Sequence, residues 1–95
     1  MVDGRTMRFL FRKGAVEAIL YLHRVGRAGY YEMLKQGFVV SRETFSILIR
    51  ELEREGIVAR RLIDSRPPRV EYSLTGKGRE VAEALSRLDE ILRGE

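Results

Sequence analysis

Few side chains in this sequence are suited to catalysis. His23 is the only histidine and the chain has no cysteine, so neither a catalytic triad nor a thiolate zinc site can be assembled, and disulfides and thiol redox sensing are excluded. The stretch Gly76-Lys77-Gly78 lacks the Walker spacing of a phosphate-binding loop, and no hydroxyl residue follows its lysine. We therefore expect no enzyme activity, no cofactor and no metal.

Anion binding by arginine is the chemistry that the sequence offers instead. The net charge is +4, and residues 79–95 hold three arginines against five acids, so the positive charge lies in residues 1–78. One short segment is especially basic and contains Arg60, Arg61, Arg66 and Arg69. These arginines suit contact with nucleic-acid phosphates or a minor groove. The alternative is an ordinary solvated hairpin whose charges discourage edge-to-edge pairing.

The segment from Ser41 to Gly56 predicts an amphipathic helix with both ends marked. Ser41 is a suitable N-cap and Gly56 can adopt the left-handed conformation that ends a helix. One apolar stripe must be buried, and it consists of Phe45, Leu48, Ile49 and Leu52. The opposite face and its flanks are mostly polar and are free to contact a partner: Arg42, Glu43, Thr44, Ser46, Ile47, Arg50 and Arg54. We interpret this element as a recognition helix.

Two shorter helices are predicted before it, over residues 13–25 and 30–36, so that the second and the capped helix form a helix-turn-helix. Residues 1–13 carry four basic side chains and several apolar ones, and their pattern fits either a strand or a helix. We favour a hydrophobic clasp on the core or on a second subunit through Phe9 and Phe11. The alternative is a basic arm on nucleic acid.

After Gly56 the pattern predicts two strands, over residues 57–63 and 69–74, joined by a turn with two prolines. Thr75 can cap a last helix that runs to about Leu92. Its apolar positions follow the spacing of a helix–helix seam: Val81, Leu85, Leu88 and Leu92. We expect this helix to pair with its equivalent in a homodimer, whereas packing onto its own domain is the rival interpretation.

These elements predict an α+β fold of the winged helix-turn-helix type, with a three-helix core, a two-stranded hairpin wing and a C-terminal dimerisation helix. We expect one domain over 1–95, divided into an arm (1–12), a core (13–75) and the dimerisation helix (76–95). No apolar run approaches the roughly 20 residues of a membrane span, and no signal peptide is evident, so we expect a cytoplasmic protein. The lack of asparagine and the single glutamine suggest a thermophile.

The wing and the turn after it, Arg66-Pro-Pro-Arg-Val-Glu-Tyr-Ser-Leu-Thr-Gly-Lys-Gly78, resemble those of HxlR-type regulators, within the wider HxlR, MarR and PadR winged-helix group. The segment from Ser41 to Val58 is similar to their recognition helix. The resemblance implies a dimeric, sequence-specific transcriptional regulator that binds a pseudo-palindromic DNA operator. On the family pattern the DNA-binding positions are Arg42, Glu43, Thr44, Ser46, Ile47, Arg50, Arg66 and Arg69.

Three departures from the family pattern matter. The sensor cysteine near the first helix is missing, so thiol sensing does not transfer to this chain. Gly14 stands where the family has a bulky tryptophan, and Ile47 stands where a polar base-reading residue is common. An exposed isoleucine can meet a thymine methyl group, or it can contact a protein.

Our leading hypothesis is a DNA-binding transcriptional regulator with the helix of residues 41–55 in the major groove and the wing of residues 60–71 on the backbone or in the minor groove. The alternatives are a protein–protein interaction module and a non-specific architectural DNA-binding protein. The sequence names neither the operator nor any small-molecule effector.

Overall fold

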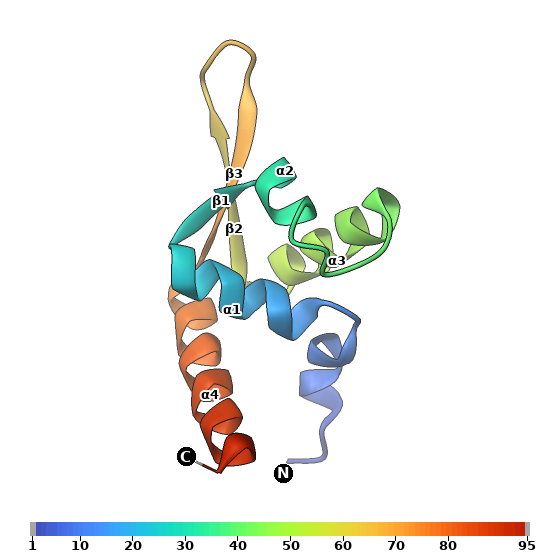
Figure 1. The fold of residues 1–95 in the computed structure, drawn as a ribbon, viewed down its shortest axis with the longest axis vertical. Helices are drawn as coiled ribbons and strands as arrows, with labels where there is room; N and C mark the ends of the chain where they lie inside the picture. The colour runs from blue at the N-terminus through green and yellow to red at the C-terminus, as the bar shows by residue number, and fades with distance from the viewer. Residues whose placement is uncertain (1, 95) are drawn as a thin grey trace.

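The computed structural model describes residues 2–94 and has the element order of a winged helix (Figure 1). This order confirms the predicted α+β class. The elements in chain order are the 3₁₀ helix η1 (Arg5–Phe11), α1 (Ala15–Val25), β1 (Arg27–Gly29), α2 (Tyr30–Leu34), α3 (Arg42–Arg54), β2 (Val58–Ile63), β3 (Arg69–Leu74) and α4 (Gly76–Arg93).

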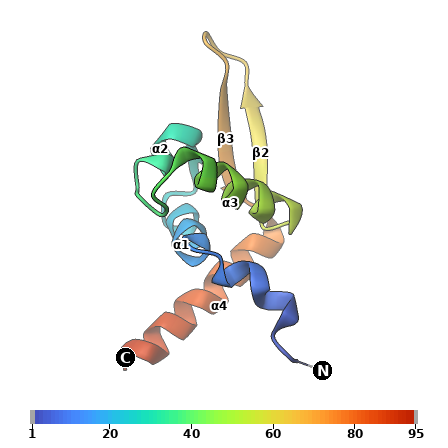
Figure 2. The same ribbon diagram turned by 90° about the vertical axis from the view of Figure 1, so that its right-hand side faces the viewer.

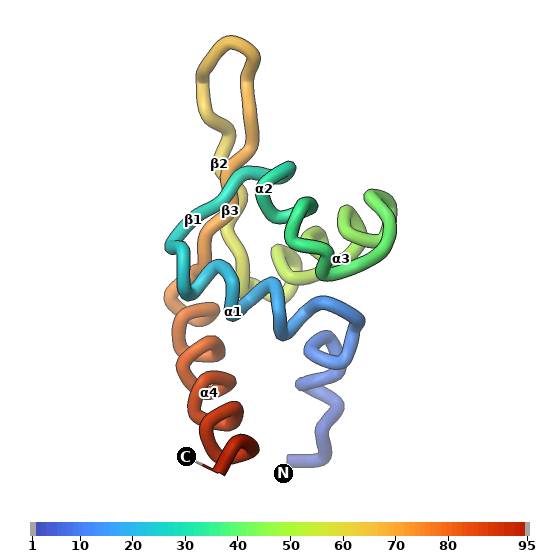
Figure 3. The backbone as a smooth tube through the Cα atoms, in the orientation of Figure 1, coloured from blue at the N-terminus to red at the C-terminus, as the bar shows by residue number. Residues whose placement is uncertain are grey.

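The molecule is elongated, with extents of 46 × 26 × 26 Å. The β2–β3 hairpin projects from one end, whereas η1 and α4 extend from the other, with α1 crossing between them (Figures 1 and 3). In the view turned by 90°, α3 runs across the face of the molecule while η1 and α4 diverge below it (Figure 2). The predicted recognition helix, α3, and the predicted dimerisation helix, α4, therefore lie in different parts of the fold.

The ends of the long helices form as their sequences predict. The Ser41 hydroxyl accepts a hydrogen bond from the Thr44 backbone N–H at 3.1 Å at the start of α3. The Thr75 hydroxyl accepts one from the Gly78 N–H at 2.9 Å at the start of α4. Gly56 has a φ of +76°, the left-handed conformation expected just after α3.

One hydrophobic core joins all the major elements. The four apolar residues of the α3 stripe are buried, and they pack in the same cluster as residues from α1, β3 and α4. The largest fully buried side chains are Phe45, Ile19, Leu22, Met33, Leu48, Leu52, Ile57 and Val58. The core thus fixes which face of α3 is turned outward.

The start of α4 and its cap are hydrogen-bonded to the residues that follow α3. Lys77 Nζ donates to the Glu55 carbonyl at 3.1 Å, and the Thr75 hydroxyl donates to the Gly56 carbonyl at 2.6 Å. Gly78 is buried where α4 packs against the backbone of Ile57. A Cβ atom at position 78 would lie 2.0 Å from the Ile57 carbonyl oxygen. A side chain at this position is incompatible with the observed packing.

The sheet has one strand more than the sequence predicts. β1 pairs antiparallel with β3, Ala28 opposite Tyr72, which gives the strand order β1-β3-β2. Three residues are too short to show a two-residue period, so this strand forms through its pairing rather than through a local pattern. The second helix, predicted over residues 30–36, is shorter in the structure than predicted: α2 ends at Leu34.

The loop before α3 packs so closely on position 14 that only glycine fits there. Gly14 has a φ of +87°, and a Cβ there would lie 2.9 Å from the Phe38 carbonyl oxygen and 3.1 Å from a methyl of Val39. The loop therefore approaches the start of α1 closely enough to exclude a side chain. This contact accounts for the departure from the bulky residue that the family resemblance implies.

Candidate nucleic-acid interface

The outward face of α3 carries most of the side chains that the sequence assigned to DNA reading. Arg42, Glu43 and Arg50 are exposed, and Ile47 is 51% exposed although it is aliphatic. By their helical spacing, Glu43, Ile47 and Arg50 lie opposite the buried stripe, and Arg42 lies on its flank. The exposed face has a mixed charge, with no large excess of either sign along the helix.

Two of the predicted reading residues are instead partly buried in contacts within the protein. The Ser46 hydroxyl lies 2.7 Å from the phenol oxygen of Tyr30 in a hydrogen bond, and the ring of Tyr30 packs edge-on against Phe45. The Thr44 hydroxyl is hydrogen-bonded to the Ser41 hydroxyl at 2.7 Å. Both hydroxyls therefore stabilise the start of α3 and its packing on α2.

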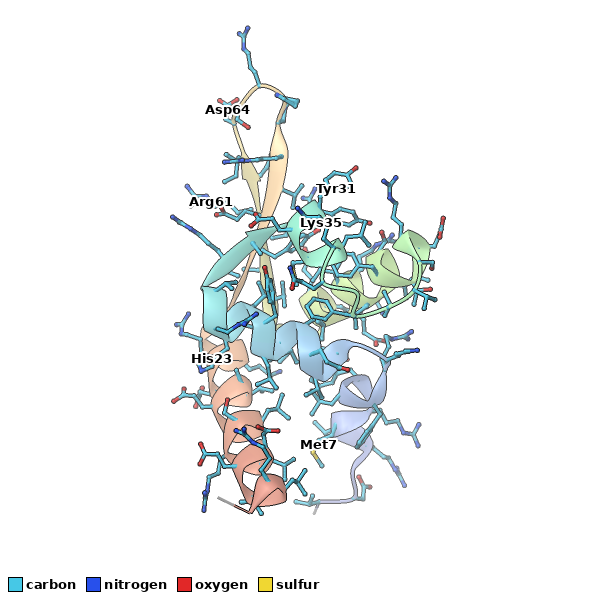
Figure 4. All side chains as sticks on the ribbon, in the orientation of Figure 1. Met7, His23, Tyr31, Lys35, Arg61 and Asp64 are labelled. Atoms are coloured by element: carbon cyan, nitrogen blue, oxygen red, sulfur yellow. The ribbon has the colours of Figure 1, made fainter. Side chains whose placement is uncertain are left out.

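A contact between Arg42 and Tyr31 joins α3 to α2 at the surface. The Arg42 guanidinium lies 5.5 Å from the centroid of the Tyr31 ring, which is the geometry of a cation–π interaction. Tyr31 is 62% exposed and lies on the outer side of α2 (Figure 4). Of the two adjacent tyrosines, Tyr30 is thus packed against the core and Tyr31 lies at the surface.

Tyr31 also borders a hollow of about 530 Å³ that reaches from α2 to the wing. Its other walls include Tyr30, Tyr72, Arg60 and Arg69. Surface residues therefore continue from α3, through Tyr31, to the arginines of the hairpin. An extended anion is the kind of partner that this basic, aromatic surface suits.

The wing has the register that its pattern predicts. β2 and β3 pair antiparallel from Val58 opposite Leu74 to Ile63 opposite Arg69. Arg66 and Arg69 are both exposed at or beside the tip, where Figure 4 places Asp64 as well. The Ser65 hydroxyl donates to the Pro67 carbonyl at 2.8 Å and so restrains the turn.

Arg60 is a further candidate contact, which the sequence placed among the basic residues of the hairpin but which the family pattern did not include among the DNA-binding positions. Its register opposite Tyr72 brings it to the side of the wing that faces α2. Burial raises the pKa of the Tyr72 phenol, and the positive charge of Arg60 opposes this rise. The two-residue period of the strand was the available signal, because it separates Arg60 from the neighbouring Arg61.

The segment before α1 is a 3₁₀ helix, which resolves the strand-or-helix alternative. Phe9 and Leu10 pack against the core, whereas Phe11 is 79% exposed. Arg12 forms a double contact with Glu51 of α3. This segment is therefore held on its own domain by apolar and ionic contacts, with one aromatic side chain left uncovered.

An apolar groove separates η1 from α4, away from the wing. It has a volume of about 460 Å³, and Met7 points into it (Figure 4). The first half of α4 packs on the domain through Ala82, Val81 and Leu85, as one interpretation of its pattern predicts. Farther along, Leu88, Ile91 and Leu92 are 49%, 55% and 77% exposed.

Metal ligation and membrane insertion find no support among the described residues. Within residues 2–94, no three or more His, Asp or Glu side chains are grouped so as to hold a metal ion. His23 is exposed near the end of α1. No helix in this part of the chain is both long and apolar enough to cross a bilayer.

The three-helix core, the exposed face of α3 and the projecting hairpin define a winged helix-turn-helix protein. Over residues 13–94 the chain matches the family described as HxlR-like helix-turn-helix, and it belongs to that family.

Sequence relatives with curated descriptions are transcriptional regulators, not enzymes. An HTH-type transcriptional regulator of Halalkalibacterium halodurans is 31% identical over 87 residues, which cover 92% of this chain and 77% of that protein. The HTH-type regulator YdeP of Bacillus subtilis is 36% identical over 67 residues, or 70% of this chain and 52% of YdeP. For the first three relatives the match spans only 38%, 52% and 62% of their own lengths.

Solved structures give the same fold. A MarR-family transcriptional regulator from Enterococcus faecalis V583 superposes with a TM-score of 0.85 at 26% identity, covering 94% of this chain and 80% of that one. A transcriptional regulator from Salmonella typhimurium superposes with a TM-score of 0.75 at 25% identity, covering 92% and 77%. The predicted winged-helix fold and the HxlR and MarR resemblance are therefore confirmed.

Proposed function

We propose that the chain is a sequence-specific, double-stranded DNA-binding transcriptional regulator that acts as a homodimer. α3 enters the major groove, and the wing follows the backbone or the minor groove. The observation that carries this proposal is the continuous surface from α3 through Tyr31 to Arg60 and Arg69. It presents a helix for base contacts and arginines for phosphates.

The charge on this surface differs between α3 and the wing. The α3 segment contains acidic as well as basic residues, and Glu51 is already bound to Arg12. Phosphate attraction must therefore come chiefly from the wing arginines. Affinity of this origin falls with increasing salt, because each neutralised phosphate releases counterions.

Dimerisation is supported by the apolar surface on the second half of α4 and by the groove beside it. Leu88, Ile91 and Leu92 are exposed in the single chain, as is Phe11 of η1. A two-fold pairing of these surfaces would bury them and would place two copies of α3 on one duplex. The expected operator is then an inverted repeat with half-sites about 34–36 Å apart, or one helical turn.

The experiment that tests the proposal is selection from random duplex DNA followed by sequencing, at two salt concentrations. We expect enrichment of an inverted repeat and weaker retention at the higher salt. Binding without enrichment would instead show an architectural DNA-binding protein. Absence of binding at low salt would contradict the proposal and favour a protein–protein interaction module, for which the exposed Ile47 is the supporting feature.

A further inference from the structure

Val40 is an aliphatic residue that the fold leaves uncovered. It lies immediately before the Ser41 cap of α3 and is 93% exposed, whereas the adjacent Val39 is 8% exposed. An apolar residue before an N-cap often packs on the fourth residue of the helix, which here is Phe45. Phe45 is fully buried by other contacts. Val40 therefore contributes little to the packing of this domain.

Ile47, within α3 itself, is a second uncovered aliphatic residue. It is 51% exposed, and its spacing from Glu43 and Arg50 places it on the outward face between charged side chains. The buried stripe of α3 is complete without it. Folding of the single chain thus explains neither Val40 nor Ile47.

We propose that Val40 and Ile47 contact the C5-methyl groups of thymine bases in the major groove. This inference rests on the proposed DNA-binding function and states which feature of the DNA these two side chains recognise. Among unmodified base pairs, only A·T and T·A present a methyl group in the major groove, and aliphatic side chains contact it favourably. Each operator half-site therefore contains thymines at the positions that face the start and the middle of α3.

Charged neighbours favour DNA over a protein as the occupant of this surface. Arg42 and Arg50 are exposed on the same helix, and the Arg60 and Arg69 side chains continue the positive charge toward the wing. Aliphatic side chains on a surface that also presents Arg42 and Arg50 match thymine methyl groups that lie near phosphates and the acceptor edges of guanine. Protein binding to the same aliphatic pair is an outcome that the test distinguishes.

The test removes single methyl groups from the DNA. In the selected operator, each thymine of one half-site is replaced in turn by deoxyuridine, which lacks only the C5-methyl group. We expect a several-fold loss of affinity at one or two positions with the unchanged protein. The loss at one of these positions should disappear with Val40→Ala or with Ile47→Ala. Val25→Ala, which truncates a 43% exposed valine at the end of α1, is the matched control and should retain every loss.

Circular dichroism should show that the three variants fold, since each removed side chain is exposed. Operator binding that is unaffected by every deoxyuridine, or an operator half-site without thymine, would overturn the inference and leave the proposed function intact. Absence of binding to any duplex would overturn both. Loss of an interaction with a protein in Ile47→Ala, without any effect on DNA, would assign the surface to a protein partner.

Discussion

Arg12 and Glu51 form a bidentate ion pair that joins the segment before α1 to α3. Arg12 Nη2 donates to Glu51 Oε2 at 3.1 Å, and Arg12 Nε donates to Glu51 Oε1. The hydrogen bonds from Arg12 lower the pKa of the Glu51 carboxyl, against the opposing effect of burial. Because η1 also lines the apolar groove, this pair connects the candidate dimer surface with α3.

The ion pair predicts a pH dependence of stability. A carboxyl whose pKa is lowered by folding stabilises the native state above its unfolded pKa, near 4.5. This contribution is lost as the pH falls through the lower, folded value. Glu51→Gln should therefore unfold at a lower temperature than the unchanged protein at pH 7, and the difference should vanish at acidic pH. Glu83→Gln, which alters an exposed carboxyl of α4, is the control and should show no such convergence.

Gly78→Ala should destabilise the protein severely, by about 3 kcal/mol or more, because the added methyl group would overlap the Ile57 backbone. Gly76→Ala is a matched control two residues away, where the nearest atom to a Cβ is Arg79 Nη2 at 3.7 Å. It should be neutral or slightly stabilising. Urea unfolding of both variants measures the difference, and equal stabilities would contradict the close contact between α4 and Ile57.

The hydrogen bond between Tyr30 and Ser46 should stabilise the packing of α2 on α3. Tyr30→Phe removes one partner at little cost in shape, and a loss of about 1 kcal/mol is expected. A double-mutant cycle with Ser46→Ala isolates the interaction between them. If Ser46 instead reads bases, Ser46→Ala should weaken operator binding more than it lowers stability, and the cycle should show no coupling.

Removing Arg66 and Arg69 together should weaken DNA binding similarly for all sequences. If each side chain neutralises one phosphate, the slope of log affinity against log salt should decrease by about 2. Arg87→Ala with Arg93→Ala removes the same charge from α4 and should leave most of the slope unchanged. An equal effect of both pairs would indicate only a dependence on net charge.

Leu88→Glu should convert the proposed dimer into a monomer. Leu88 is 49% exposed in the single chain and lines the groove, so the charge should disturb a subunit interface more than the domain itself. Leu62→Glu on the wing, where the leucine is 65% exposed, should remain dimeric. Sedimentation measures both, and a monomeric unchanged protein at high micromolar concentration would contradict the dimer.

The helices, their caps and the wing hairpin were predictable because their signals are local. Ser41 and Thr75 bond to N–H groups three residues away, and the stripe on α3 repeats every three to four residues. Such patterns also identify which side of α3 faces outward. The fold class and the outward face of α3 therefore follow from the sequence by itself.

Only the tertiary structure decided the contacts between distant segments. The pairing of β1 with β3, the Arg12–Glu51 pair across 39 positions and the bond between Tyr30 and Ser46 depend on how the elements pack. For the same reason the sequence could not separate Ser46 and Thr44, whose hydroxyls are hydrogen-bonded within the protein, from the exposed Arg42. Local periodicity determines the face of a helix, whereas neighbouring elements determine which side chains on that face remain free.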